Sequence, residues 1–294
     1  MKNVLKAVAV LVFLASTAFA QIPWSRHVVL VVEENHGYSS IVGSSSMPYL
    51  NSLIKKYGLA SAYYANTHPS IGNYFEMTTG QIITNNDSYT SSVSVNNMVR
   101  AMITAGVTWK SYAESLPKVG YTGGNVYPYA KRHNPFAYFT DAANSSSEKL
   151  NLVPFTQFKT DLANNALPRF SYIVPNMHHD MHDCPDGMST CTDAQKKAAG
   201  DYWLKTNIAP LLANSAFQNG GLLVITFDEA SDTDKTHGGG RVATVVIGPK
   251  VKPGYKSWTL YQHQSLLRTL LNALGIYSNY PASSSTAPPM KDFF

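Results

Sequence analysis

Apolar residues along this chain fall into short continuous runs that alternate with longer segments of helical spacing. The continuous runs are typical of strands buried on both faces of a parallel sheet. Strands are predicted for the run after His27 and for residues 61–66, 108–113, 169–174, 222–227 and 242–247. Helices are predicted for residues 47–57, 70–79, 95–105, 155–164, 192–213 and 263–274. This alternation predicts an α/β fold with a mainly parallel central sheet and helices on both faces.

Glycine, proline and loop length refine this pattern. Gly80 and Gly275 each follow a predicted helix, at the position where glycine commonly ends helices. Pro210 falls inside the last-but-one predicted helix and predicts a kink or a break there. Two polar connections, residues 118–148 and 177–192, exceed ordinary loop lengths, and such loops usually carry sites.

The chain opens with the pattern of a secretory signal peptide over residues 1–20. Lys2 and Lys6 precede a short apolar run, and small residues ending at Ala20 follow it. That run is too short to span a bilayer comfortably, and no later stretch is long enough, so we expect no stable membrane insertion. We therefore expect cleavage near Ala20 and a secreted or periplasmic protein whose residues 21–294 form a single domain. A retained N-terminal anchor is the alternative.

The two cysteines, Cys184 and Cys191, flank a turn-forming Pro-Asp-Gly stretch. In an oxidising compartment this spacing favours a local disulfide. A cysteine metal site is the weaker interpretation, because the pair lacks the Cys-x2-Cys spacing.

The charge of the chain is mildly positive. The formal net charge is +5, and removal of Lys2 and Lys6 with the signal peptide lowers it to +3. The 23 basic residues are scattered, so no nucleic-acid partner is evident, although a positive field suits anionic substrates. We expect a monomer or a small homo-oligomer.

Oxygen-donor side chains follow directly after two of the predicted strands. Glu34 and Asn35 come after the first apolar run, and Asp228 and Glu229 follow the strand at residues 222–227. Because ligands of open α/β sheets bind beyond the carboxyl ends of strands, these side chains could meet over one hard cation. The alternative is that they cap helices or begin loops.

Ser70 opens a predicted helix, where free backbone N–H groups and the helix dipole favour an anion. A serine there is well placed to attack phosphorus. Asn73, one turn along, lies on the same side and could donate to a phosphate oxygen. Serine is also among the best N-cap residues, so a plain helix cap is the alternative.

A histidine-rich segment follows the predicted strand at residues 169–174. It contains His178, His179 and His182 with two neighbouring aspartates. Imidazoles of this kind bind phosphate, protonate a leaving oxygen or ligate a metal, and the sequence does not separate these roles. A solvated loop is the alternative.

Three further residues are candidates for substrate binding. Lys131 and His133 lie in a loop rich in cationic and amide donors that could hold a phosphate. His237 precedes three glycines, which allow close backbone approach to a ligand but also suit a simple bend. A solvated loop explains the first two nearly as well.

Taken together, these segments resemble the phosphoesterase family that groups bacterial acid phosphatases with phosphocholine-type phospholipases C, a branch of the alkaline-phosphatase-like superfamily. The resemblance covers nearly the whole chain after residue 20. Its marks are Glu34-Asn35, Ser70-x-x-Asn73, Pro175-Asn176 with Asp180-Met-His182-Asp183, Phe227-Asp228-Glu229, and the Ser265-Leu-Leu-Arg-Thr segment. The segment from Ser70 also looks like the Thr-Phe-Pro-Asn segment of nucleotide pyrophosphatases.

The resemblance implies an alkaline-phosphatase-like sandwich and one divalent metal ion, with Ser70 bound to it as the nucleophile. The implied metal ligands are Glu34, Asn35, Asp228, Glu229 and Ser70. Asn73 would stabilise the transition state, and His182, with His178 or His179, would stabilise the transferring oxygens or protonate the leaving group. Asp228-Glu229 stands where two-zinc members carry Asp-His, which favours one site for Mg²⁺, Ca²⁺ or Mn²⁺ over Zn²⁺.

Three functional hypotheses follow. The first is a secreted metal-dependent phosphomonoesterase of acid-phosphatase type that acts on a phosphate ester through a phosphoserine intermediate. The second is a phospholipase C or another phosphodiesterase. The third is a non-catalytic exported protein that binds anions or sugars at the same site.

Overall fold

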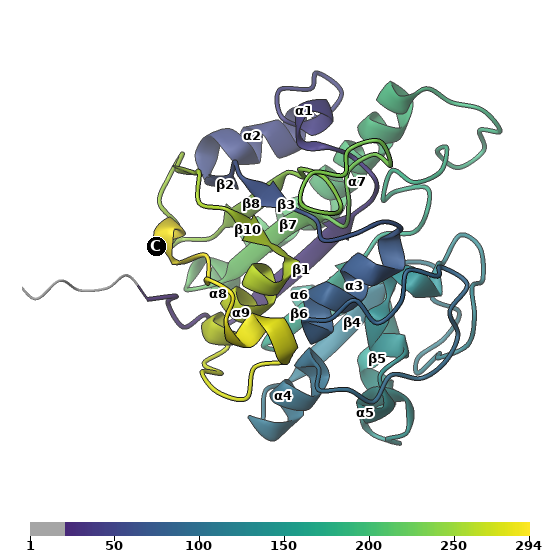
Figure 1. Ribbon diagram of the computed structural model, residues 1–294, viewed down its shortest axis with the longest axis vertical. Helices are drawn as coiled ribbons and strands as arrows, with labels where there is room; N and C mark the ends of the chain where they lie inside the picture. Colours follow the sequence, from purple (N-terminus) through teal and green to yellow (C-terminus); the bar gives the residue numbers. More distant parts are fainter. Residues whose placement is uncertain (1–20) are drawn as a thin grey trace, which may run out of the picture.

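A mostly parallel sheet forms the centre of the computed structural model, which describes residues 21–294 (Figure 1). The predicted signal peptide lies outside the described residues. The strands of this sheet are β1 (Val28–Glu33), β2 (Gly58–Ala60), β4 (Trp109–Ala113), β5 (Leu152–Pro154), β6 (Phe170–Val174), β7 (Leu222–Phe227), β8 (Thr244–Ile247) and β9 (Lys256–Ser257). They pair in the order β5-β4-β6-β1-β7-β8-β2-β9. Of these, β8 alone runs antiparallel to its neighbours, which confirms the predicted mainly parallel sheet.

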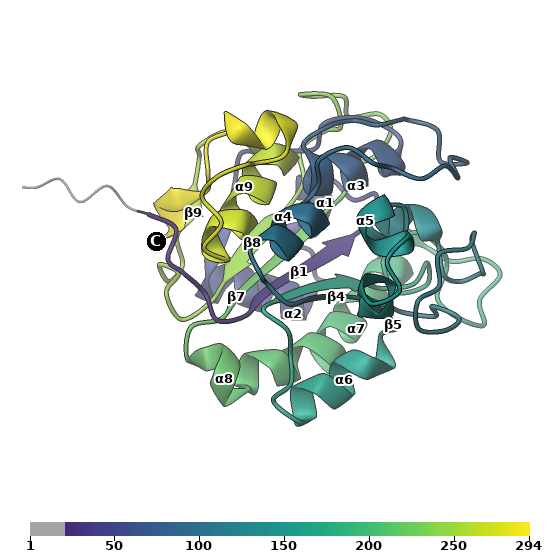
Figure 2. The same ribbon diagram turned by 90° about the horizontal axis from the view of Figure 1, so that it is seen from below.

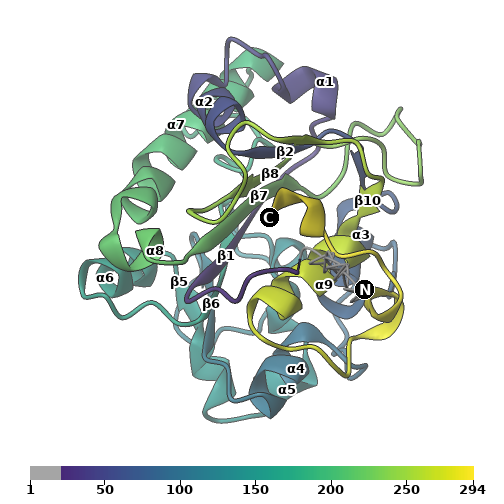
Figure 3. The same cartoon turned by 90° about the vertical axis from the view of Figure 1, so that its left-hand side faces the viewer.

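Helices cover both faces of the sheet, as predicted. The α-helices are α1 (Tyr38–Ile41), α2 (Pro48–Lys56), α3 (Ser70–Thr79), α4 (Met98–Thr104), α5 (Thr140–Ala143), α6 (Thr156–Ala163), α7 (Asp193–Ala213), α8 (Ser215–Gln218) and α9 (His263–Ala273). Short 3-10 helices are η1 (Lys131–His133), η2 (Pro135–Ala137), η3 (Glu148–Asn151), η4 (Ala282–Ser285) and η5 (Lys291–Phe293). Figures 2 and 3 show α6, α7 and α8 on one face and α3, α4 and α9 on the other. Within residues 21–294, no helix is long and apolar enough to cross a membrane.

The register of β1 and β7 determines where their ends lie. The two strands pair in parallel from Val28 with Leu222 to Glu33 with Phe227. Both are buried along their whole length, and each buried Val, Leu or Ile contributes about 1.5–3 kcal/mol to folding. Because the pairing ends with Glu33 beside Phe227, the residues that follow each strand emerge side by side at one edge of the sheet.

The strand predicted at residues 61–66 is shorter than predicted and lies outside the central sheet. The chain instead forms β2 in the main sheet, turns at Ser61, and then forms β3 (Tyr63–Tyr64). β3 pairs in parallel with β10 (Tyr261–Gln262) in a separate two-stranded sheet. A buried hydrogen bond of 3.0 Å between the Tyr63 hydroxyl and His263 Nδ1 links this small sheet to the start of α9.

Two helices differ from their predicted limits for local reasons. Helix α7 runs unbroken through Pro210, which lies in its last turn, so that only three helical residues follow the proline. The helix is therefore not broken at Pro210, and the kink, the other form of the prediction, stays a prediction. Helix α4 begins three residues later than predicted, because the Asn97 side chain caps it by accepting a hydrogen bond from the backbone N–H of Arg100.

The predicted disulfide joins Cys184 to Cys191, with their Cα atoms 5.5 Å apart. We expect the double substitution Cys184→Ser with Cys191→Ser to lower the free energy of unfolding by about 2–3 kcal/mol, because the bond constrains a short loop in the unfolded chain. Urea unfolding with and without reductant measures this. Reductant should destabilise the wild type and leave the double variant unchanged; equal stability of the two proteins under oxidising conditions would contradict the expectation.

Candidate active site

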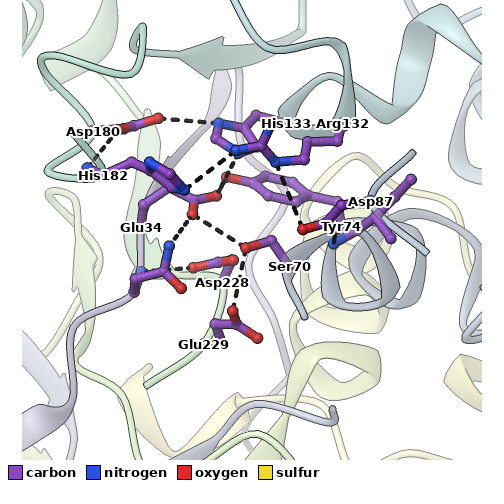
Figure 4. A network of polar contacts seen from close by, with 12 residues as sticks. Glu34, Ser70, Tyr74, Asp87, Arg132, His133, Asp180, His182, Asp228 and Glu229 are labelled. Atoms are coloured by element: carbon purple, nitrogen blue, oxygen red, sulfur yellow. Dashed lines mark hydrogen bonds and ion pairs between the residues drawn. The ribbon is translucent and has the colours of Figure 1, made fainter. Parts of the chain in front are cut away.

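The ends of β1 and β7 converge with the start of α3 (Figure 4). The backbone N–H of Asn35 donates to Asp228 Oδ1 over 3.0 Å, and the Asn35 side-chain amide donates to Glu34 Oε2 over 2.6 Å. Ser70 Oγ lies 3.2 Å from Glu34 Oε2 and 3.3 Å from Glu229 Oε1. The structure thus brings together the four strand-end residues and Ser70.

Ser70 is the first residue of α3 and does not cap it. The N-cap position belongs to Pro69, and no side chain caps this end. The Ser70 side chain is instead buried against carboxylates, 3 % exposed. Its hydroxyl therefore stands in a polar cluster and not at a solvated helix end.

Asn73 faces the same cluster one turn along α3. Its Nδ2 donates to Thr67 O over 2.8 Å and to Glu229 Oε2 over 3.3 Å. Its Oδ1 accepts from the backbone N–H groups of Asn66 and Thr67. The bonds with Asn66 and Thr67 hold the loop before α3 in place. The longer contact of Nδ2, with Glu229, points toward the cluster.

The buried carboxylates of the cluster repel one another. Burial, with Asp228 and Asp180 close by, raises the pKa of Glu34 well above its ordinary value. Burial raises the pKa of Asp228 to about 6, and burial together with Asp228 raises that of Glu229 to about 10. Among the described residues, Asp228 Oδ2 is buried without a hydrogen-bond partner. Oxygen donors gathered in this way fit a bound hard cation, which would neutralise them.

His133, in η1, lies between two of these acids. Its Nε2 is 3.1 Å from Glu34 Oε1, and its Nδ1 is 3.0 Å from Asp180 Oδ2. The side chain is 1 % exposed. The sequence pattern suggested that His133 binds substrate. In the structure its ring instead contacts Glu34, one of the strand-end acids, and Asp180. Asp180 also accepts the backbone N–H of Glu34 over 2.9 Å, so this segment supports the end of β1 twice.

Tyr74 is a site residue that the sequence reasoning missed. Its hydroxyl donates to Glu34 Oε1 over 2.6 Å, and its ring stacks on His133 with the ring centroids 5.2 Å apart. Helical spacing could have identified it, because residue i+4 lies on the same face as residue i, here Ser70.

We expect Tyr74→Phe to lower both cation affinity and hydrolytic kcat/KM by about tenfold or more, because groups that orient a ligand carboxylate affect metal binding to this extent. Tyr138→Phe is a matched control, since its hydroxyl donates to the backbone oxygen of Tyr89. Calorimetric titration with Mn²⁺ and steady-state kinetics measure the two effects. Equal Mn²⁺ affinities for Tyr74→Phe and wild type would rule out the orienting role.

His182 borders the cluster together with Arg132. The Nη2 group of Arg132 donates to His182 Nε2 over 3.2 Å, and His182 Nδ1 lies 2.8 Å from Asp183 Oδ1. Arg132 Nε also lies 3.9 Å from Asp87 Oδ2, and Asp87 accepts the backbone N–H of Ile71. A cation and an imidazole therefore stand beside the carboxylates. Nothing in the local sequence pattern marks Asp87, which reaches this place through tertiary packing.

The other two candidate histidines of this segment make different contacts. His178 Nδ1 lies 2.7 Å from the backbone oxygen of Cys184. His179 Nδ1 lies 2.9 Å from Glu114 Oε2. Within the described part of the chain, none of these contacts joins either ring to Ser70 or to the strand-end acids.

Lys131 and His237 also lie apart from the cluster. The Lys131 ammonium group sits 4.2 Å from the ring centroid of Tyr138, and the side chain is largely buried. The His237 ring packs against Tyr64 with centroids 4.3 Å apart. Both residues also contact amide side chains, and none of the contacts given for the described residues joins either one to the strand-end carboxylates.

A cavity of about 600 Å³ opens beside the cluster. Asn35 and His182 form part of its wall, and polar and cationic residues such as Tyr38, Lys196 and Arg241 line it further out. This volume lies within the range of small-molecule sites. The cavity therefore offers room for the part of a substrate that lies beyond the reacting group.

Comparisons with known proteins identify the family of this chain. Residues 44–276 match the model of the Phosphoesterase family. The chain is 32% identical over 279 residues to a phosphatidylinositol-3-phosphatase of Mycobacterium tuberculosis, covering 94% of this chain and 85% of that protein. It is 31% identical over 255 residues to a probable acid phosphatase of Kluyveromyces lactis, covering 82% of this chain and 56% of that protein. The chain thus spans little more than half of this fungal relative.

Solved structures support the fold. The chain superposes on the lipoteichoic acid synthase LtaP of Listeria monocytogenes with a TM-score of 0.62 and 11% identity, covering 91% of this chain and 76% of that one. It superposes on an alkaline phosphatase superfamily protein of Vibrio parahaemolyticus with a TM-score of 0.59 and 15% identity, covering 89% and 70%. The fold is therefore alkaline-phosphatase-like. The chain belongs to the Phosphoesterase family and is a hydrolase acting on phosphoric ester bonds.

Proposed function

We propose that this hydrolase is an exported, metal-dependent phosphomonoesterase of acid-phosphatase type with Ser70 as its nucleophile. The observation that carries the proposal is the position of the Ser70 hydroxyl, buried between Glu34 and Glu229 at the start of α3. A serine in such a place has no structural need for two carboxylate neighbours, whereas a nucleophile that shares a cation with them does.

The residues that would hold the cation are Glu34, Asn35, Ser70, Asp228 and Glu229. Their donor set, with the unpartnered Asp228 Oδ2, fits one divalent ion with mostly oxygen ligands, so Mg²⁺, Ca²⁺ or Mn²⁺ is favoured over Zn²⁺. When bound, such an ion lowers the pKa of the serine hydroxyl and neutralises charge on the phosphoryl group.

Two in-line steps at phosphorus then follow from the positions of the side chains. Ser70 Oγ forms a bond to phosphorus as the bond to the leaving oxygen breaks, which gives a phosphoserine. We assign to the Nδ2 group of Asn73, in place of its longer contact with Glu229, and to the guanidinium of Arg132 the role of donating to the phosphoryl oxygens. Water then attacks the phosphoserine, releases inorganic phosphate and restores the hydroxyl.

His182 is the group that we assign to proton transfer. Asp183 lies 2.8 Å from Nδ1 and orients the ring, which leaves Nε2 as the atom that would pass a proton to the leaving oxygen in the first step. The neutral ring that results can accept a proton from the attacking water in the second step. His182 also borders the cavity of about 600 Å³, where the leaving group would lie.

Parallel assays test the substrate class. We expect hydrolysis of p-nitrophenyl phosphate to exceed that of bis-p-nitrophenyl phosphate by at least about a hundredfold in kcat/KM, which corresponds to about 2.7 kcal/mol of transition-state stabilisation. Phosphatidylcholine vesicles serve as the phospholipase C substrate. Faster turnover of either diester would replace the phosphatase assignment with the diesterase alternative, and no turnover of any ester would favour the anion-binding one.

Export of the protein is part of the proposal. The disulfide between Cys184 and Cys191 supports an oxidising compartment, and the signal pattern at residues 1–20 points the same way. N-terminal sequencing of protein recovered from outside the cytoplasm should begin at Gln21.

A further inference from the structure

His68 contacts Glu229, the carboxylate that also contacts Ser70. Its Nδ1 lies 2.9 Å from Glu229 Oε2 and 3.8 Å from Asp232 Oδ1. Glu229 uses its second oxygen, Oε1, to contact Ser70. These three side chains form a group in which ligand atoms of one imidazole and two carboxylates all lie within 4.8 Å of one another.

The hydrogen bond at the far side of the His68 ring fixes its tautomer. Nε2 lies 3.0 Å from the backbone oxygen of Asp234, and a carbonyl oxygen only accepts, so Nε2 carries a proton. An Nδ1 atom without a proton presents its lone pair to the Glu229 carboxylate. Two acceptor atoms at 2.9 Å repel each other unless a proton or a cation lies between them.

The direction of the contact favours a cation over a proton. Nδ1 of His68 is buried and, among the described residues, has no hydrogen-bond partner, although Glu229 Oε2 is close enough for one. The oxygen thus lies off the direction in which a ring N–H would point. A cation about 2.1 Å from both atoms, with a right angle between the two bonds, places them about 3.0 Å apart and off that direction.

Asp232 can supply the third ligand of this group. Asp232 is 90% exposed, so its carboxylate is free to move toward a bound ion from the 3.8 Å position. One nitrogen and two carboxylate ligands suit Mn²⁺ or Zn²⁺ better than Mg²⁺ or Ca²⁺, which prefer oxygen alone.

We propose that His68, Glu229 and Asp232 bind a second divalent transition-metal ion, with Glu229 bridging it to the site around Ser70. The proposal adds an ion to the single one assigned above and does not depend on Ser70 being the nucleophile. Pairs of neighbouring ions act in phosphoester hydrolysis by stabilising both the attacking and the leaving oxygen.

Counting Mn²⁺ and Ca²⁺ sites in metal-free, full-length protein tests the proposal. Calorimetric titration should find two Mn²⁺ sites and one Ca²⁺ site in the wild type. His68→Ala should retain one Mn²⁺ site, and Asp232→Ala should weaken one of the two sites at least about tenfold. Asp186→Ala, which removes an exposed acid elsewhere, is the matched control and should keep both.

Asp228→Asn separates this proposal from the proposed function. It should remove the Ca²⁺ site and leave one Mn²⁺ site that His68→Ala then abolishes. One Mn²⁺ site in the wild type that survives both His68→Ala and Asp232→Ala would overturn the second site. A Ca²⁺ site that survives Asp228→Asn would instead overturn the first. Because Asp232 is exposed, its replacement should preserve the fold and keeps the test valid even if His68→Ala fails to fold.

Discussion

Replacing Ser70 with alanine should lower kcat/KM for p-nitrophenyl phosphate by more than about a thousandfold, since it removes the atom that forms the bond to phosphorus. Water held at the same position is a poorer nucleophile and lacks the covalent route. The loss should appear in kcat, because the groups that bind the phosphoryl oxygens remain. Steady-state kinetics on purified, metal-loaded protein measure the effect.

Thr78→Ala is the matched control for this substitution. Thr78 lies two turns further along α3, and its buried hydroxyl donates to the backbone oxygen of Tyr74 over 2.7 Å. Its loss should change stability slightly and kcat/KM by less than about tenfold. If Ser70→Ala hydrolyses the substrate within about tenfold of wild type, Ser70 is not the nucleophile.

Removal of bound cations should abolish hydrolysis and destabilise the fold. Without a cation, Glu34, Asp228 and Glu229 remain buried together, and burial with mutual repulsion raises their pKa values. A bound ion neutralises these acids. Because the ion binds the folded chain and not the unfolded one, its addition should raise the melting temperature. Activity should fall by more than about a hundredfold on chelation and return with Mg²⁺, Mn²⁺ or Ca²⁺.

Elemental analysis of the dialysed protein must accompany this experiment. Asp228→Asn is an independent way to weaken cation binding, because it removes the charge of one ligand without adding bulk. That variant should be inactive, and its melting temperature should respond less to added Mg²⁺ than that of the wild type. Full activity in a preparation verified as free of metal would contradict the proposed role of the cation.

The position of the site at one sheet edge was predictable from the sequence, because parallel pairing is a simple rule. Two buried runs that end in oxygen donors bring those donors together when the strands are neighbours, and β1 pairs directly with β7. Ser70 does not follow from this rule, because β3, the strand before its helix, lies in the separate two-stranded sheet; the Ser70-x-x-Asn73 motif identified it instead. Tyr74 was within reach of the same helical argument.

Long-range packing decided the rest. The sequence pattern predicted only that His133 lies in a loop with cationic residues. The folded chain shows that it is buried between Glu34 and Asp180. The ring of Tyr138 takes up the Lys131 ammonium group, which local sequence cannot reveal. The different sheet of the strand predicted at residues 61–66 has the same origin, since Tyr63 pairs with a partner almost 200 residues away.

A crystal structure of the metal-loaded protein with vanadate bound tests the central claim most directly. Vanadate imitates phosphorus in transfer, so the account predicts a five-coordinate vanadium with Ser70 Oγ at one apex. Glu34, Asn35, Asp228 and Glu229 should surround a single cation in contact with that serine oxygen, and His182 should face the opposite apex. Vanadate bound away from Ser70, or a metal-loaded protein with no cation among those four side chains, would contradict the account.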